Sequence, residues 1–359
     1  MKSGGWVISM EKTESTTASG VPERNTTGMK TQESILPPHP RDPDLIWRDG
    51  YDFLGLTIHD GIVVRSPWNA PCSSPRRKVS SRSLEEHIEI INIYKTEIAM
   101  VIAEDISFIT RCPSLKYLTI IPADTAGDAF DYSPLYSMPE VKGLFCDTVY
   151  GPKDQYATTI DCARLKGLEG IHAYGPGYEN VSQVMTLKNL FLTHYRKKDL
   201  TGVSHSPVLN NLVVAKSSIK TLEGIQEPPK MQCVHLLDNR SLADIGALRM
   251  VKRTLKKLQI RNCPKITDFS VIGELEHLEH LELAGSNELP DLRFLQTMPN
   301  LKTLILLMNV KDGDITPCQK LSYVYLQNRR HYNLKCDDLP KGDYAWGDDG
   351  IDPRWRFRY

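Results

Sequence analysis

Residues Leu278–Leu283 read LEHLEL, and Leu301–Leu306, which begin 23 residues later, read LKTLIL. Both stretches place apolar side chains at the first, fourth and sixth positions. In an extended strand the fourth and sixth side chains point to one face, and the side chains beside them point to the other face. One short strand cannot bury its leucines alone, so the pattern predicts a stack of strands that share one core.

The same pattern continues along about two thirds of the chain. Eleven copies are spaced 19 to 27 residues apart, and all 33 anchor positions are apolar. Besides the two stretches above, copies begin at Ile88, Leu115, Val141, Leu168, Leu187, Leu209, Met231, Leu255 and Leu321. The pattern resembles the leucine-rich-repeat family, whose period is roughly 20–29 residues, and the central copies are most similar to the short repeats of bacterial internalins. The resemblance implies an α/β solenoid with parallel strands on its concave face and short helices or 3₁₀ turns on its convex face.

The resemblance also implies a residue that binds exposed backbone, usually Asn or Cys, eight positions after each first anchor. Asn239, Cys263, Ser286 and Asn309 occupy that position in four successive copies, and Thr96 and Ser217 occupy it in two others. Five copies depart from the pattern, with Ala123, Val149, Pro176, Tyr195 and Arg329. We expect irregular geometry in those five copies.

Composition divides the chain into four predicted parts. Residues 1–44 are rich in Ser, Thr, Pro and Gly and are expected to be disordered. Residues 45–83 are expected to form an N-terminal cap with a β-hairpin around Asp60-Gly61. The repeats then occupy residues 84–330, and the segment 95–104 after the first predicted strand is long enough for a short helix.

The last part, residues 331–359, contains an aromatic and basic run. Two interpretations are open for it. Its aromatic side chains cap the last repeat, or they form a protruding recognition tail, because Trp and Arg dominate the energetics of many interfaces. The residues concerned are Trp346, Arg354, Trp355 and Arg356.

Overall composition excludes several classes of protein. Lys and Arg together number 44, as do Asp and Glu, so the basic excess of a nucleic-acid binder is absent. No apolar run approaches the roughly 18 residues of a transmembrane helix, and the N-terminal apolar stretch is too short for a signal-peptide core. The eight cysteines are scattered without a C-x-x-C motif, which indicates reduced thiols. We therefore predict a cytoplasmic protein that binds neither nucleic acid nor membrane.

No motif indicates catalysis, a metal or a cofactor. The chain lacks G-x-S-x-G, a P-loop and H-E-x-x-H. Cys233 points outward by register but has no neighbouring base, and a catalytic thiol needs a lowered pKa. His277 and His280 lie an odd number of residues apart, so in a strand they face opposite sides and cannot share an ion. We predict that the protein is not an enzyme.

The outward strand positions carry the predicted binding surface. Side chains two, four and six positions after each first anchor line the concave face. The candidates for partner binding are Tyr94, Tyr117, Phe145, His172, Tyr174, Phe191, His235, Arg261, Ile305, Tyr323 and Tyr325. Exposed apolar patches usually mark contact sites, whereas the alternative is that strand propensity alone favours these residue types.

The predicted function is a protein–protein interaction module that binds its partner through this concave face. Two more specific functions are alternatives. One is a bacterial immunity or inhibitor protein that blocks a toxin or an enzyme, and the other is a secreted effector or adhesin similar to the internalins.

Overall fold

The computed structural model describes residues 45–46, 51–53, 56–58, 61–65, 82–123, 130–147, 159–175, 177–203, 205–225, 230–344 and 355–357. Contacts divide the chain into two units, Met1–Pro37 and Pro38–Tyr359, and every described residue belongs to the second unit. The disorder predicted for residues 1–44 therefore lies outside the described residues.

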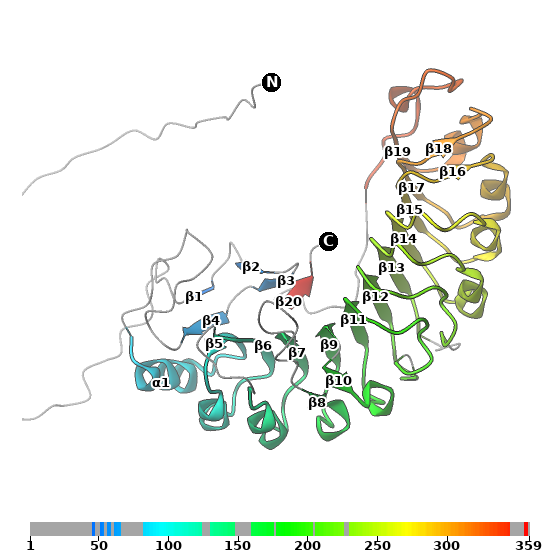
Figure 1. Cartoon of the computed structure of the whole chain (residues 1–359). Coiled ribbons are helices and arrows are strands. Elements are labelled where there is room, and N and C mark those ends of the chain that lie inside the picture. The colour runs from blue at the N-terminus through cyan, green and yellow to red at the C-terminus, as the bar shows by residue number, and fades with distance from the viewer. Residues whose placement is uncertain are drawn as a thin grey trace, which may run out of the picture. The chain divides into compact units, whose positions relative to one another are not determined.

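One thirteen-stranded sheet runs through the described chain (Figure 1). Strand β1 (Leu45–Ile46) lies at one edge and pairs antiparallel with β4, and the remaining strands are parallel. In sheet order these are β4 (Gly61–Arg65), β5 (Ile98–Ala103), β6 (Tyr117–Pro122), β7 (Gly143–Asp147), β9 (Gly170–Tyr174), β11 (Asn189–Thr193), β12 (Asn211–Ala215), β13 (Cys233–Leu237), β14 (Lys257–Arg261), β15 (His280–Ala284), β17 (Thr303–Leu306) and β19 (Tyr323–Leu326). Parallel pairing requires a return segment between successive strands, and the repeat spacing supplies one.

The inward anchors stack in register through the sheet. Leu258 pairs with Leu281, Leu281 with Leu304, and Leu304 with Val324. All four side chains are fully buried, as are most anchors in the other strands. Each repeat thus buries its leucines against the repeats before and after it. The predicted leucine-rich-repeat solenoid is confirmed.

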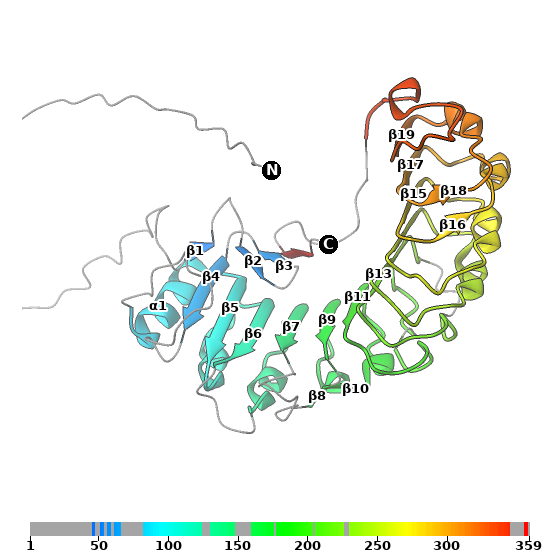
Figure 2. The same cartoon turned by 45° about the horizontal axis from the view of Figure 1, so that its top comes forward.

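The return segments hold short 3₁₀ helices on the side opposite the strands (Figure 2). They are η1 (Ser107–Arg111), η2 (Ser133–Ser137), η3 (Cys162–Arg164), η4 (Val181–Gln183), η5 (Gly246–Val251), η6 (Ser270–Glu274), η7 (Arg293–Thr297), η8 (Thr316–Lys320) and η9 (Cys336–Asp338). Two pairs of two-residue strands also join neighbouring returns, namely β8 (Ile160–Asp161) with β10 (Tyr178–Glu179) and β16 (Glu288–Leu289) with β18 (Asn309–Val310).

An aspartate lies just before most of these 3₁₀ helices and accepts a hydrogen bond from the backbone N–H two residues later. For example, Asp268 accepts from Ser270 N at 2.8 Å, and Asp291 accepts from Arg293 N at 2.8 Å. The same bond is made by Asp105, Asp131, Asp161, Asp199, Asp244 and Asp314. A short polar side chain at this position starts the turn and satisfies a backbone donor.

The first predicted strand is wrong. Residues Leu84–Tyr94 form helix α1, and the segment expected to hold a short helix contains strand β5. The apolar spacing Ile88, Ile91 and Ile93 fits a helix face as well as a strand, and Ile93 is half exposed rather than an anchor. Ile98 and Ala99 supply the buried strand positions instead.

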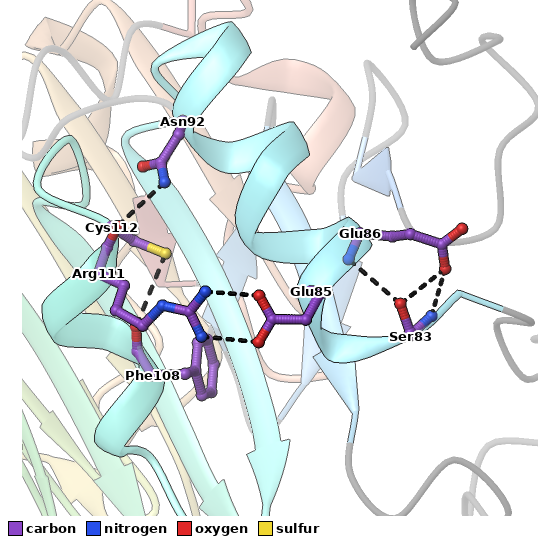
Figure 3. A network of polar contacts seen from close by, with 7 residues as sticks. All are labelled: Ser83, Glu85, Glu86, Asn92, Phe108, Arg111 and Cys112. Carbon is purple, nitrogen blue, oxygen red and sulfur yellow. Dashed lines mark hydrogen bonds and ion pairs between the residues drawn. The ribbon is translucent and has the colours of Figure 1, made fainter. Parts of the chain in front are cut away.

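Figure 3 shows why a helix forms here. Ser83 Oγ accepts a hydrogen bond from Glu86 N, while Ser83 N donates to Glu86 Oε2, which completes a capping box. Glu85 then forms a bidentate ion pair with Arg111 of η1, and Asn92 donates to the Arg111 carbonyl at 3.0 Å. The sequence S-x-x-E at residues 83–86 is the helix signal that the repeat pattern obscured.

The predicted hairpin around Asp60-Gly61 is also wrong. Strand β3 (Leu56–Ile58) pairs with β2 (Tyr51–Phe53) on one side and with β20 (Trp355–Phe357) on the other. Strand β4 instead joins the main sheet beside β5. Its residues Ile62, Val63 and Val64 are all buried, and a strand buried on both faces needs neighbours that a two-stranded hairpin cannot supply.

The C-terminal residues split between two places. Tyr332 contacts the preceding repeat, because its hydroxyl accepts a hydrogen bond from Val310 N at 2.9 Å. Leu339, seven residues later, is also buried. Lys341 forms a β-bridge with Tyr323 of β19. Strand β20, however, pairs with β3 near the other end of the chain. Residues of the segment 331–341 thus contact the last repeats, whereas Trp355 and Arg356 belong to β20, whose backbone pairs with β3.

Candidate functional site

The strand face is organised in rows that cross the sheet. The central row runs through one outward side chain of each strand, from Thr119 of β6 to Tyr325 of β19. Its members in order are Thr119, Phe145, His172, Phe191, Val213, His235, Gln259, Glu282, Ile305 and Tyr325. Neighbours in a row lie about 4.8 Å apart, so the row presents a continuous surface.

The first part of the central row is buried. Phe145 and His172 are fully buried and their rings lie 4.6 Å apart, while His172 lies 4.1 Å from the Phe191 ring. Phe145 and Phe191 belong to an apolar cluster on the strand face that also contains Val63, Ile98, Met100, Val213, Ala215 and Leu237. Phe145, His172 and Phe191, which the sequence predicted to contact a partner, are therefore buried and offer no exposed surface in this structure. They pack against each other and hold adjacent strands together.

The polar middle of the strand face is buried as well. His235 Nδ1 lies 2.8 Å from Gln259 Oε1, and both side chains are buried. Lys257 is only 5% exposed, and burial lowers the pKa of His280. His235 is thus inaccessible, contrary to the prediction, because its ring is enclosed in a hydrogen-bonded interior network. Arg261 on β14 is partly exposed.

The last part of the strand face is open. Tyr325 is 49% exposed, and Tyr323, two residues earlier on β19, is partly exposed. The ring of Tyr344 lies 5.1 Å from the ring of Tyr323, and Tyr344 is half exposed. We call these three residues the tyrosine patch. Ile305 and Glu282 continue it across β17 and β15, and both are partly exposed.

The remaining predicted contact residues lie elsewhere. Tyr94 ends α1 and so is not on a strand, although it is exposed. Tyr117 and Tyr174 are partly buried against the apolar cluster, and the Tyr174 ring lies 5.1 Å from His194. Trp346 and Arg354 lie outside the described residues. Sequence reasoning missed Tyr344, because it follows the last repeat and belongs to no periodic pattern.

A cavity of about 470 Å³ opens at the ends of β9 and β11. Ala173, Leu192 and Val203 are among its lining residues, and Tyr195 lies beside them. Tyr195 occupies the backbone-binding position where Asn239 elsewhere accepts from Ser217 N and donates to the Val214 carbonyl. A tyrosine ring cannot repeat that short contact, and in this copy the residue at the position lines the cavity instead.

The seven cysteines that the structure describes are all buried. Burial raises the pKa of Cys112 and Cys263 to about 11, and that of Cys162 and Cys318 to about 12. At neutral pH these four thiols are protonated, and a thiol is far less nucleophilic than a thiolate.

Within the described ranges no three His, Cys, Asp or Glu side chains group as metal ligands would. In the same part of the chain, no helix has both the length and the apolar character needed to cross a bilayer.

Solved structures that match the chain include bacterial repeat proteins. An internalin of Listeria monocytogenes, InlF, matches with 18% identity and a TM-score of 0.42, covering 75% of this chain and 92% of that one. Internalin C2 of the same species matches with 18% identity and a TM-score of 0.42, covering 54% and 83%. A leucine-rich-repeat protein of Leptospira interrogans matches with 17% identity and a TM-score of 0.35, covering 63% and 52%. No protein-family model and no curated protein sequence matches the chain.

Proposed function

We propose that the protein is a non-enzymatic interaction module that binds a protein partner through the open part of its strand face. The observation that carries this proposal is the tyrosine patch, where Tyr325 and Tyr344 are each about half exposed on a rigid frame. Tyrosine offers a large contact area at low entropic cost, and interface energy concentrates in a few such residues.

The frame beneath the patch supports recognition. Leu304 of β17 and Val324 of β19 point to the opposite face of the sheet from the tyrosines, and both side chains are fully buried. Their packing fixes the strand backbone, so the tyrosines keep their mutual positions before a partner arrives. A preorganised surface loses less entropy on binding, which raises affinity.

The partner surface is thus narrower than the whole concave face. Ile305, Tyr323 and Tyr325 remain candidates from the sequence, and Tyr344 joins them. The buried cysteines support a reducing compartment, in which case the module works in the cytoplasm.

The test compares two baits and then measures affinity. Wild-type protein and a Tyr323→Ala/Tyr325→Ala variant are used to capture partners from the native cell, and the protein retained only by the wild type is purified. Calorimetric titration should then show that the double variant binds it at least ~2 kcal/mol more weakly. Glu274→Ala is the control, since Glu274 is on η6, on the side opposite the strands, and makes only an exposed ion pair with Arg249.

Equal affinity of the double variant, with an unchanged circular-dichroism melt, would refute the proposed surface. A loss of binding in Glu274→Ala alone would move the interface to the return side.

A further inference from the structure

The tyrosine patch has an acidic neighbour, Glu282 of β15. Glu282 of β15 makes no hydrogen bond or ion pair with any residue in the described part of the chain. The nearby Glu279, by contrast, pairs with Lys302 at 2.6 Å. An isolated carboxylate beside an apolar surface is a place where a cation would be stabilised.

Glu282 and the tyrosines face the same space. In register, Glu282 pairs with Ile305, which pairs with Tyr325, so Glu282 and Tyr325 stand two strands apart, about 10 Å at the usual strand spacing. The Tyr344 ring packs on Tyr323 of β19 and feels the Glu282 charge, since burial and then that carboxylate raise the pKa of Tyr344. Ile305 forms an apolar floor between the acidic and aromatic sides.

No basic side chain in the described part of the chain forms an ion pair with Glu282. Lys341, beside β19, donates from Nζ to the Val324 carbonyl at 2.7 Å and to Cys336 Sγ at 3.0 Å. On the other side, Lys257 of β14 is buried and Arg261 is partly exposed, and neither pairs with Glu282. Asp343, next to Tyr344, is exposed and adds negative charge.

We propose that the tyrosine patch and Glu282 bind the side chain of an arginine presented by the protein partner. The guanidinium stacks on the exposed tyrosine faces, as a cation does within about 6 Å of an aromatic ring. Its N–H groups donate to the Glu282 carboxylate, for which a planar fork is suited. The methylene stem lies on Ile305.

This inference rests on the proposed function, because it names the partner chemistry of the same surface. The probe is a short peptide of alternating arginine and serine, and the matched peptide carries citrulline, which has the same shape without the charge. The full chain is labelled at its tyrosine rings, and Tyr323→Phe, Tyr325→Phe and Tyr344→Phe variants assign their NMR signals.

The arginine peptide should shift the signals of all three tyrosines and bind about tenfold more tightly than the citrulline peptide. Glu282→Gln, which keeps the side-chain shape, should remove most of that preference. Glu140→Gln, an exposed glutamate beside η2 on the return side, should leave it unchanged.

Equal binding of the two peptides, or an unchanged preference in Glu282→Gln, would overturn the arginine assignment. So would the absence of any shift at the three tyrosines. The proposed function is judged separately, by the calorimetric titration with the captured partner. A partner that depends on Tyr323 and Tyr325 but not on Glu282 would keep the interaction surface and reject the cationic contact.

Discussion

The strand face of the first repeats and that of the last repeats differ in burial although they share one sheet. In the central row, Phe145 and His172 of β7 and β9 are fully buried, whereas Tyr325 of β19 is 49% exposed. Both regions pair in the same parallel register, have apolar inward anchors and carry aromatic side chains at the same outward position. The residue type on a strand therefore does not decide its role.

The degree of burial, rather than the residue type, distinguishes the roles of the outward aromatic side chains. At β7, β9 and β11 the rings pack on one another and add a second apolar layer to the sheet. At β19 the tyrosine rings keep much of their surface in water. Removing this apolar surface from water by binding a partner is favourable. The first region contributes to stability, and the second is available for binding.

The largest expected effect is on stability at the buried end. Phe145→Ala should lower the free energy of unfolding by about 3–5 kcal/mol, because it opens a cavity in a packed cluster. Tyr325→Ala, at the same position of the row, should lower it by less than ~1 kcal/mol, because half of its ring is already in water. Chemical denaturation of both variants measures the contrast, and equal losses would erase the distinction between the two regions.

Replacing a buried inward anchor with alanine should also lower the free energy of unfolding strongly. Leu281→Ala or Leu304→Ala removes a fully buried side chain and should cost about 2–5 kcal/mol. Glu282→Ala, adjacent to Leu281 but outward, should cost well under ~1 kcal/mol. If urea unfolding shows similar losses at positions 281 and 282, the inward and outward assignments of β15 are reversed.

A third expected effect concerns pH at the buried end. Burial lowers the pKa of His172 well below its usual value near 6.5. Between the two pKa values the unfolded chain binds the proton and the folded protein does not. The stability due to neutral His172 is therefore complete above about pH 6.5 and falls by about 1.4 kcal/mol per pH unit below it.

His172→Phe removes this titration and fits a ring between Phe145 and Phe191. Its stability should depend less steeply on pH between pH 6.5 and acidic values in a thermal-unfolding series. His277→Gln changes an exposed residue and is the control. An unchanged slope in His172→Phe would show that His172 is not the buried titrating group.

Much of this fold follows from the sequence because the anchors repeat. Within the thirteen-stranded sheet, each strand from β6 to β19 lies where the L-x-x-L-x-L pattern places it, since that register buries the apolar anchors. The error at α1 arose where local signals compete, because Ser83 and Glu86 form a capping box that the apolar spacing does not reveal.

The candidate site was harder to predict than the fold. The pattern separates inward from outward side chains, but the exposure of an outward residue depends on contacts made outside its own repeat. Phe145 and Tyr325 look equivalent in the sequence for that reason. Tyr344 was missed because its place against Tyr323 depends on how the chain turns after the Lys341 bridge.

The distinction between a buried and an open part of the strand face is tested most directly by hydroxyl-radical footprinting of the free protein. Met100, Phe145 and Phe191 should be protected until the protein unfolds, whereas Tyr325 and Tyr344 should be oxidised in the folded state. Met185 and Met250, about half exposed on the return side, calibrate the rate for accessible side chains. Oxidation of Met100 and Phe145 in the folded protein as fast as that of Met185 and Tyr325 would contradict the division of this face.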